Sequence, residues 1–294
     1  MEAATGTATH LPSSFPARAW AWLRRNGLLI FAGLAVLYML VPILVVALFS
    51  FDAGNDQGEL DFAWNAFTLD YWREAFANEA VTQSMRTSLE LAALSTIFST
   101  AIGTLMALAL VRYQFFGRRA SNLLIILPMA TPEIVIGAAL LSMFVLPPFN
   151  GFLDLGFQTL LLAHVMFSIS FVVVVVRSRL IGFDRSLEEA AADLGAPPLT
   201  TFRTVTLPLL APAIIAAALL AFALSLDDFV ISNFNSGSTE TFPLYIFGAN
   251  QRGIPVQVNV LATMLFAVTV VAISLVLWQQ RRAEQMASVR PDDV

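Results

Sequence analysis

The chain has 294 residues, of which 57% are hydrophobic and only 13% are charged. Because soluble domains carry about 25% charged residues, this composition predicts an integral membrane protein. Cysteine and lysine are both absent, which excludes disulfides, thiolate metal sites and the lysine-dependent P-loop of an ATPase. We therefore do not expect this chain to hydrolyse ATP by itself.

Six apolar stretches are each long enough to cross a bilayer as a helix, which takes about 20 residues. In chain order they are Leu28–Phe51, Leu91–Val111, Leu123–Leu146, Leu155–Val176, Ala211–Phe234 and Val258–Gln279. The first is too long for the core of a signal peptide and lacks a small-residue cleavage site after it, so we expect a retained anchor. The sequence predicts an all-α, polytopic membrane protein, with a six-helix transmembrane domain at residues 27–280 between tails at residues 1–26 and 281–294.

The arginines are distributed unevenly between the segments that join these stretches. Thirteen of the sixteen would lie inside if the N-terminus is cytoplasmic, and only Arg73, Arg86 and Arg252 would lie outside. This asymmetry follows the positive-inside rule, so we predict that both termini are cytoplasmic. The outer segments are rich in acidic residues, which suits a cationic solute that arrives from outside.

The longest predicted cytoplasmic loop, between the fourth and fifth stretches, contains a short helix with defined ends. Ser186 begins a Ser-Leu-Glu-Glu pattern, which predicts a capping box between the Ser186 side chain and Glu189. Alanines then favour the helix, and Gly195 stands where a left-handed C-cap belongs. Pro197 and Pro198 prevent continuation. A helix this short needs a surface on which to dock.

On helix signals alone, an ordinary helical loop is the simpler interpretation, but the residues also form a longer motif. The motif consists of Glu189-Ala190-Ala191, Gly195, Val205 and Leu207-Pro208. Its spacings all match the EAA loop that it resembles in ABC-importer permeases, with Val205 in place of the usual isoleucine. This resemblance implies a type I ABC-importer permease fold, in which the helix docks into a groove of the ATPase subunit. The implied ATPase-coupling residues are Ser186, Glu188, Glu189, Ala190, Ala191, Asp193, Leu194, Gly195, Val205, Leu207 and Pro208.

Other segments resemble the permeases of polyamine importers, and spermidine/putrescine importers in particular. They are Phe67–Phe76, Leu127–Leu141, Ser225–Val230, Phe242–Ile246 and Arg252–Asn259. Phe242 precedes a proline where this group more often has leucine. Permeases for iron, thiamine, sulfate or molybdate share the EAA loop, so those solutes remain alternatives.

The same resemblance implies the partners and the location of the chain. The partners are a second permease, as a homologous heterodimer partner, an ABC ATPase dimer and an extracytoplasmic solute-binding protein. ATP and magnesium would be bound by the ATPase, and this chain would bind no cofactor and no nucleic acid. The chain would lie in lipid, as a multi-pass protein of the bacterial cytoplasmic membrane.

Two adjacent aspartates, Asp227 and Asp228, lie towards the outer end of the fifth stretch. A charged side chain at the bilayer centre costs at least about 2.5–3.5 kcal/mol, so acids within spans usually have a function. Successive helix residues point about 100° apart, so we expect one carboxylate to face the substrate pathway and the other a neighbouring helix or the partner permease. A packing pair that bonds to neighbouring serines or an arginine is the alternative. Glu133 has two open interpretations, as a pathway residue and as a charge that stabilises a helix start.

Two other polar residues have structural interpretations, and the remaining function classes find less support. We expect His164 to be a satisfied packing residue and Glu90 to pair with Arg86, four residues earlier.

The sequence contains no nucleophile–base or metal-ligand arrangement, so no catalytic or metal site is predicted. A proton-coupled secondary transporter would use the pathway acids as relay groups, but such folds contain internal repeats, which we do not find here.

Overall fold

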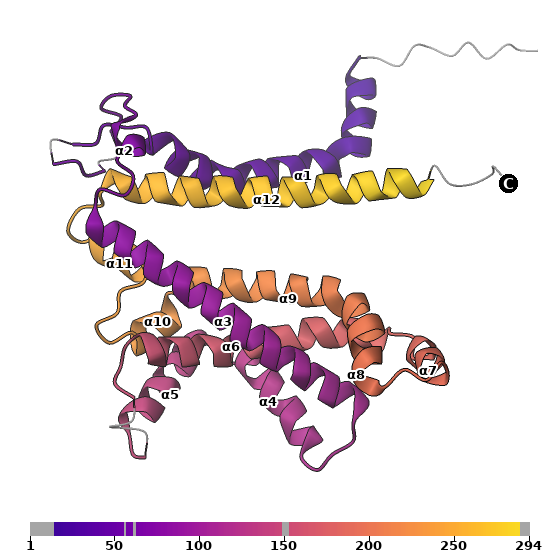
Figure 1. The fold of residues 1–294 in the computed structure, drawn as a ribbon. Coiled ribbons are helices and arrows are strands. Elements are labelled where there is room, and N and C mark those ends of the chain that lie inside the picture. The colour runs from indigo at the N-terminus through magenta and orange to yellow at the C-terminus, as the bar shows by residue number, and fades with distance from the viewer. Residues whose placement is uncertain (1–14, 56, 61–62, 149–152, 289–294) are drawn as a thin grey trace, which may run out of the picture. The chain divides into compact units, whose positions relative to one another are not determined.

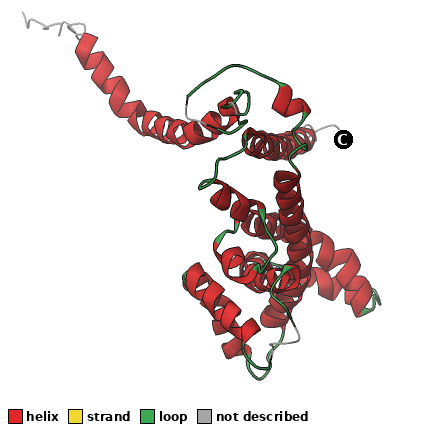
Figure 2. Cartoon of the chain, turned by 90° about the vertical axis from the view of Figure 1, so that its left-hand side faces the viewer, coloured by secondary structure: helices red, strands yellow, loops and turns green. Residues whose placement is uncertain are grey.

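The computed structural model describes residues 15–55, 57–60, 63–148 and 153–288. Within these residues the chain consists of helices and loops, with two isolated β-bridges and no strand (Figure 2). It divides into two compact units, one made of residues 1–75 and 255–294 and the other of residues 76–254. The prediction of an all-α protein is confirmed for the described part of the chain.

In the first unit, the long helices α1 (Phe15–Phe49) and α12 (Val256–Ser288) pack against each other, and the short α2 (Asp70–Arg73) packs on α12. The loop after α1 is organised by Asp52, which is fully buried. Its carboxylate accepts hydrogen bonds from the backbone amides of three residues, Gly54, Asn65 and Ala66. These amides satisfy the buried charge, so the loop folds back on itself.

In the second unit, three helices form the core: α3 (Glu79–Arg112), α6 (Phe157–Ile181) and α9 (Leu207–Asp227), which lie against one another (Figure 1). Their shared interior is built from aliphatic side chains that are fully or almost fully buried. Gly103 brings α3 close to α6, because a Cβ atom at this position would lie only 2.7 Å from the Val172 Cγ1 atom. A side chain here would therefore push the two helices apart.

The third predicted stretch is not one continuous helix, because it is interrupted just before Glu133, where one of the two interpretations of that residue places a helix start. It forms α4 (Arg118–Ala130) and α5 (Glu133–Val145), which are bent by 116° at Thr131-Pro132. Proline lacks an amide hydrogen and disfavours helical geometry in the residue before it. Thr131 is accordingly extended, with φ −92° and ψ 136°.

The fifth predicted stretch is also interrupted, at the aspartate pair. Helix α9 ends at Asp227, and α10 (Val230–Asn235) follows after a break. Asp228 between them is extended, with φ −65° and ψ 121°. The expectation that both aspartates lie in one uninterrupted helix is therefore wrong. The remaining helix of this region, α11 (Phe242–Ala249), packs on α3.

Three short elements lead from α6 into α9: α7 (Ser186–Asp193), α8 (Pro198–Thr201) and one turn of π-helix, η1 (Phe202–Thr206). No break separates α8, η1 and α9, so the apolar helix runs from Pro198 to Asp227 over 30 residues.

Among the described residues, four helices are long and apolar enough to cross a membrane, and the bent pair α4–α5 would make five. The apolar part of α12, Val256–Val271, is shorter. Six spans, the cytoplasmic termini and the domain boundaries thus stay predictions. Helix α1 begins at Phe15, within the predicted N-terminal tail, and α12 ends at Ser288, within the predicted C-terminal tail. Residues 1–14 and 289–294 of these tails lie outside the described part of the chain.

Candidate functional site

The C-terminal end of α7 has the geometry that the sequence predicts. Gly195 has φ +83°, in the left-handed region. Its amide donates to the Ala192 carbonyl at 2.8 Å, and the Ala196 amide donates to the Ala191 carbonyl at 3.0 Å. These two hydrogen bonds form a Schellman motif, which closes the helix. No heavy atom lies within 4 Å of the position that a Cβ would take, so only backbone conformation requires glycine here.

The N-terminal end of α7 differs from the prediction, and the capping box is wrong. Ser186 is the first helical residue and no side chain caps the helix from the Arg185 position, which already has helical dihedral angles. Instead, the Ser186 amide donates to Oδ1 of Asp184 at 2.9 Å. This hydrogen bond stabilises the ionised form and lowers the pKa of Asp184. The polar residue that closes the turn therefore lies two positions earlier than expected.

One face of α7 is open to its surroundings. Leu187 is 47% exposed and Leu194 is 90% exposed, and Glu189 and Ala190 are also exposed. Apolar side chains on a short polar loop are costly in water, so this face is suited to contact another protein.

Glu188 lies on the inner side of α7 and ties the helix to the rest of the second unit. Its Oε1 atom accepts hydrogen bonds from the Arg112 guanidinium at the end of α3 and from the Thr206 hydroxyl in η1. The guanidinium also lies 6.0 Å from the centre of the Phe183 ring. These contacts join α3, α7 and the start of α9. Sequence reasoning included Glu188 but missed its partners, because Arg112 is 76 residues away in the chain.

The second half of the predicted coupling motif lies in the long helix itself. Val205 belongs to η1, and Leu207 and Pro208 are the first residues of α9. Proline is well tolerated in the first turn, where its missing amide would have no helical partner. A displacement of this segment would be carried along one continuous helix towards Asp227.

Asp228 is a buried capping residue. Its side chain is 5% exposed, and its carboxylate accepts hydrogen bonds from the backbone amides of Ser232 at 2.8 Å and Ile231 at 3.3 Å. These amides belong to the first turn of α10, where orphan donors need an acceptor. The geometry thus gives this carboxylate a structural role.

His164 is a buried, satisfied packing residue, as the sequence predicts. Its Nδ1 atom lies 2.8 Å from the Ser225 hydroxyl, and its Nε2 atom lies 3.0 Å from the Ser232 hydroxyl and 3.5 Å from the Asp228 carboxylate. Ser225 also bonds to the Ser95 hydroxyl at 2.9 Å. This network joins α3, α6, α9 and α10.

Asp227 and Glu133 are both exposed, in contrast to Asp228. Glu133 is the first residue of α5, which fits a carboxylate at a helix start. Its charge also interacts with those of Asp227 and Asp228, so the three predicted pathway acids lie in one region.

Among the described residues, no group of three histidine, aspartate or glutamate side chains has the arrangement of a metal site. Glu90 pairs with Arg86 at 2.7 Å on the surface, as predicted.

Sequence reasoning missed a groove between α3 and α9. It has a volume of about 520 Å³ and is lined mostly by apolar side chains. Three threonines of α3 also line it: Thr96, Thr100 and Thr104. Their hydroxyls have no hydrogen-bond partner within the described residues. The spacing of four, which places them on one helix face, is the signal that could have revealed this polar stripe.

Comparison with known proteins identifies similar sequences over most of the chain. Residues 99–285 match the family "Binding-protein-dependent transport system inner membrane component". The spermidine/putrescine transport system permease protein PotC of Haemophilus influenzae is 36% identical over 239 residues, which cover 81% of this chain and 90% of that protein. PotC of Escherichia coli (strain K12) is 38% identical, with 80% and 87% covered. The putrescine transport system permease protein PotI of the same strain is 36% identical, with 84% and 88% covered.

Solved structures show the same fold at lower sequence identity. A chain of a bacterial ABC transporter that imports the acidic polysaccharide alginate matches with a TM-score of 0.61 and 17% identity, covering 92% of this chain and 99% of that chain. A chain of a bacterial alginate ABC transporter in complex with a pentasaccharide-bound periplasmic protein matches with a TM-score of 0.62 and 20% identity, covering 92% and 98%. These similarities confirm the predicted ABC-importer permease fold.

Proposed function

Because this chain belongs to the binding-protein-dependent transport system inner membrane component family, we propose that it is a permease subunit of an ATP-driven polyamine importer. The similar PotC and PotI proteins are named for spermidine and putrescine transport, which favours polyamines over the iron, thiamine, sulfate and molybdate alternatives. Family membership makes the chain a transport component of the inner membrane and not an enzyme. It also removes the support for a proton-coupled secondary transporter.

The observation that carries the coupling role is the construction of α7. Its outer face presents Leu187 and Leu194, and its inner face is tied through Glu188 to α3 and η1. A partner that moves α7 would therefore move the ends of two core helices with it. This arrangement supports a coupling helix that docks on an ATPase, whose ATP and magnesium lie on that partner.

The acids at the other end of α9 support a cationic solute. Asp227 is exposed, whereas the carboxylate of Asp228 already accepts hydrogen bonds from two backbone amides of α10. We assign the pathway role to Asp227, with Glu133 as a second carboxylate, and a capping role to Asp228. A polyamine carries several ammonium groups, and carboxylates can replace the water around them. Two exposed carboxylates would give weak binding that still permits release.

The proposed assembly contains a second, homologous permease, an ATPase dimer and a solute-binding protein outside the membrane. Support comes from the family, whose name includes the binding protein, and from the alginate transporter structure that contains a periplasmic protein.

The direct test is a transport assay on the reconstituted complex. Labelled spermidine and putrescine should each be taken up only with ATP, and each should compete with the other. Thiamine, iron, sulfate and molybdate should not compete. ATP-dependent uptake of one of these four solutes instead would retain the permease function but overturn the polyamine assignment. Uptake driven by a proton gradient without ATP would overturn both.

A further inference from the structure

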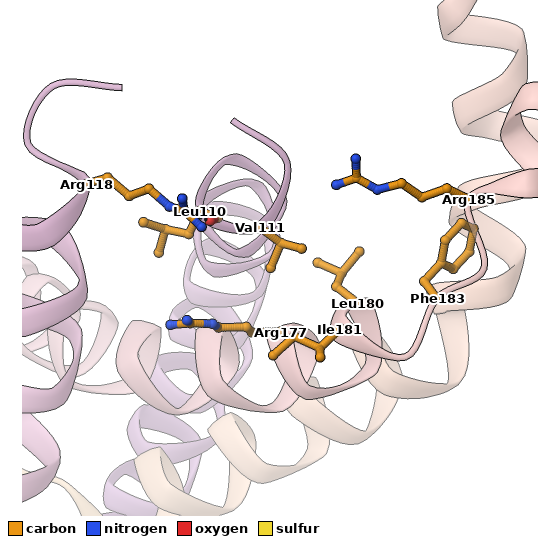
Figure 3. A pocket seen from close by; sticks show the side chains of 8 residues that line it. All are labelled: Leu110, Val111, Arg118, Arg177, Leu180, Ile181, Phe183 and Arg185. Carbon is orange, nitrogen blue, oxygen red and sulfur yellow. Dashed lines mark hydrogen bonds between the residues drawn. The ribbon is translucent and has the colours of Figure 1, made fainter. Parts of the chain in front are cut away.

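A basic hollow lies in the second unit where α3, α4 and α6 end or begin near α7. It has a volume of about 360 Å³, and three arginines from different elements line it: Arg118, Arg177 and Arg185. Arg118 is the first residue of α4, Arg177 lies in the last part of α6, and Arg185 precedes α7. Figure 3 shows Arg118 and Arg185 entering from opposite sides, with Leu110 and Val111 between them.

No carboxylate within residues 15–55, 57–60, 63–148 and 153–288 forms an ion pair with these three arginines. Nε of Arg118 donates to the Leu110 carbonyl at 2.9 Å, and Arg177 donates to Oδ1 of Asn122 at 2.7 Å. Both acceptors are neutral, and none of the acidic residues in the described part of the chain lines the hollow. Arg185 is exposed, and its side chain forms no hydrogen bond or ion pair within the described residues. Two guanidinium groups are thus held in place while most of their donors stay free for an anion.

The remaining walls of the hollow are apolar. Leu110 and Leu180 are buried, while Ile181 is 70% exposed at the rim. A site for a free inorganic anion does not need such walls, whereas an amphiphile with an anionic head uses both the arginines and the aliphatic rim.

An aromatic loop next to the hollow indicates the depth of this region. Between α3 and α4, Tyr113 and Phe115 are well exposed and Phe116 is fully exposed. Exposed aromatic side chains beside arginines are typical of the membrane–water interface, where one part of the ring is apolar and the headgroups are polar. The arginine distribution predicts that this interface is on the cytoplasmic side, where anionic lipids are attracted to basic residues.

We propose that this hollow, named here the arginine pocket, binds the phosphate headgroup of an anionic phospholipid from the cytoplasmic leaflet. Arg118 and Arg185 would contact the phosphate from two sides, and Ile181 would border the acyl chains. The bound lipid would sit beside α7 and would fill the space between the α3–α4 turn and the α6–α7 turn. This site is separate from the acids at the other end of α9 and does not depend on the identity of the transported solute.

The test uses two double variants of the full chain that have the same net charge. Arg118→Gln with Arg185→Gln removes two pocket arginines, whereas Arg119→Gln with Arg179→Gln removes two exposed arginines of α4 and α6 that do not line the hollow. Each detergent-purified protein is mixed with equal amounts of phosphatidylglycerol and phosphatidylcholine, and retained lipid is counted by native mass spectrometry.

The wild type and the control variant should retain phosphatidylglycerol in preference to phosphatidylcholine. The pocket variant should retain less, by about fivefold for each arginine, the scale of one basic side chain at an anionic surface. Arg185→Gln alone should lower phosphatidylglycerol retention about fivefold. This variant should not affect folding, because the Arg185 side chain forms no hydrogen bond or ion pair within the described residues. Millimolar inorganic phosphate should not displace the lipid.

Three results would overturn the proposal. Equal loss of phosphatidylglycerol from both double variants would indicate general charge attraction instead of a site. Displacement by inorganic phosphate would indicate a site for a soluble anion. Unchanged lipid retention in the pocket variant, together with weaker co-purification of the ATPase, would make these arginines part of a protein interface.

Discussion

The carboxylates at the two ends of α9 have different kinds of partners. At the α7 end, Glu188 is neutralised by the Arg112 guanidinium and a hydroxyl. At the other end, Asp228 is held by backbone amides and a histidine–serine network, and no arginine pairs with the acids there within the described residues. A carboxylate paired with arginine is a structural tie, whereas an exposed carboxylate without a cation can receive one from solution. These differences support our proposal that one end provides a mechanical connection and the other receives a positively charged solute.

The largest effect is expected at the α7 end, from Gly195→Asp. Aspartate and asparagine are both among the residues that tolerate the left-handed region at φ +83°, so the main effect is the negative charge that aspartate adds to the surface that we assign to the ATPase. Uptake should be abolished while insertion and folding persist, because the space around Gly195 is open. Gly195→Asn is the matched control, since asparagine tolerates the left-handed region, and it should retain most uptake. The assay measures uptake and ATPase co-purification in the same cells. Normal uptake by the aspartate variant would remove the coupling role from α7.

The ion pair between Arg112 and Glu188 can be removed by substitution of either residue. Arg112→Gln or Glu188→Gln leaves one partner unpaired in a position where both side chains are about four-fifths buried. Each should lower the free energy of unfolding by about 1–3 kcal/mol. The double variant should lose less than the sum, because both members of one pair are removed together. Thermal unfolding of the three variants measures this difference. Strict additivity would show that the two residues do not stabilise each other.

Asp228→Asn tests the structural assignment at the other end of α9. The amide keeps one acceptor oxygen but loses the second, so one of the two α10 amides loses its partner. We expect the free energy of unfolding to fall by about 0.5–2 kcal/mol, the usual range for a helix cap. Thermal unfolding is again the measurement, with Asp227→Asn as the control that should unfold like the wild type. If Asp227→Asn lowered the free energy of unfolding and Asp228→Asn did not, the capping role would belong to Asp227 and not to Asp228.

The smallest effect is expected at the start of α7. Asp184→Ala removes the acceptor of the Ser186 amide, whereas Ser186→Ala removes only a hydroxyl that interacts with Asp184 and leaves the acceptor of the amide in place. Hydrogen exchange in the first turn of α7 should become faster in the first variant and stay unchanged in the second. Faster exchange in Ser186→Ala would restore the predicted capping box.

The sequence predicted local features well where one residue type has a strong conformational preference. Gly195 is an example, because few other residues adopt its left-handed geometry at low cost. The apolar stretches also predicted where the long helices lie, since helical spans need continuous hydrophobicity. A stretch defined by its mean hydropathy does not show whether its helix is continuous, so the break at Asp228 was not predicted, and the break before Glu133 was indicated only by the residues Pro132 and Glu133. The capping box failed by two residues, because Asp184 and Ser186 are both good capping residues and only the backbone decides between them.

The tertiary part of the site could not be read from the chain. Nothing in the order of residues pairs Arg112 with Glu188, or brings His164 between Ser225 and Ser232. Such pairs depend on how α3, α6 and α9 cross. The sequence also does not decide between the roles of Asp227 and Asp228, for a related reason. The break at Asp228 turns its carboxylate towards α10, which a continuous helix would not do.

The most direct test of the difference between the two aspartates is spermidine uptake by Asp227→Asn and Asp228→Asn complexes in vesicles, with ATP hydrolysis measured in the same preparation. Loss of a charge-assisted contact costs about 1.5–3 kcal/mol, so Asp227→Asn should lower uptake about ten- to hundredfold at normal assembly and basal hydrolysis. Asp228→Asn should retain most uptake per assembled complex. Full uptake by Asp227→Asn, or a larger loss per assembled complex in Asp228→Asn, would contradict the assignment of the exposed carboxylate to the solute.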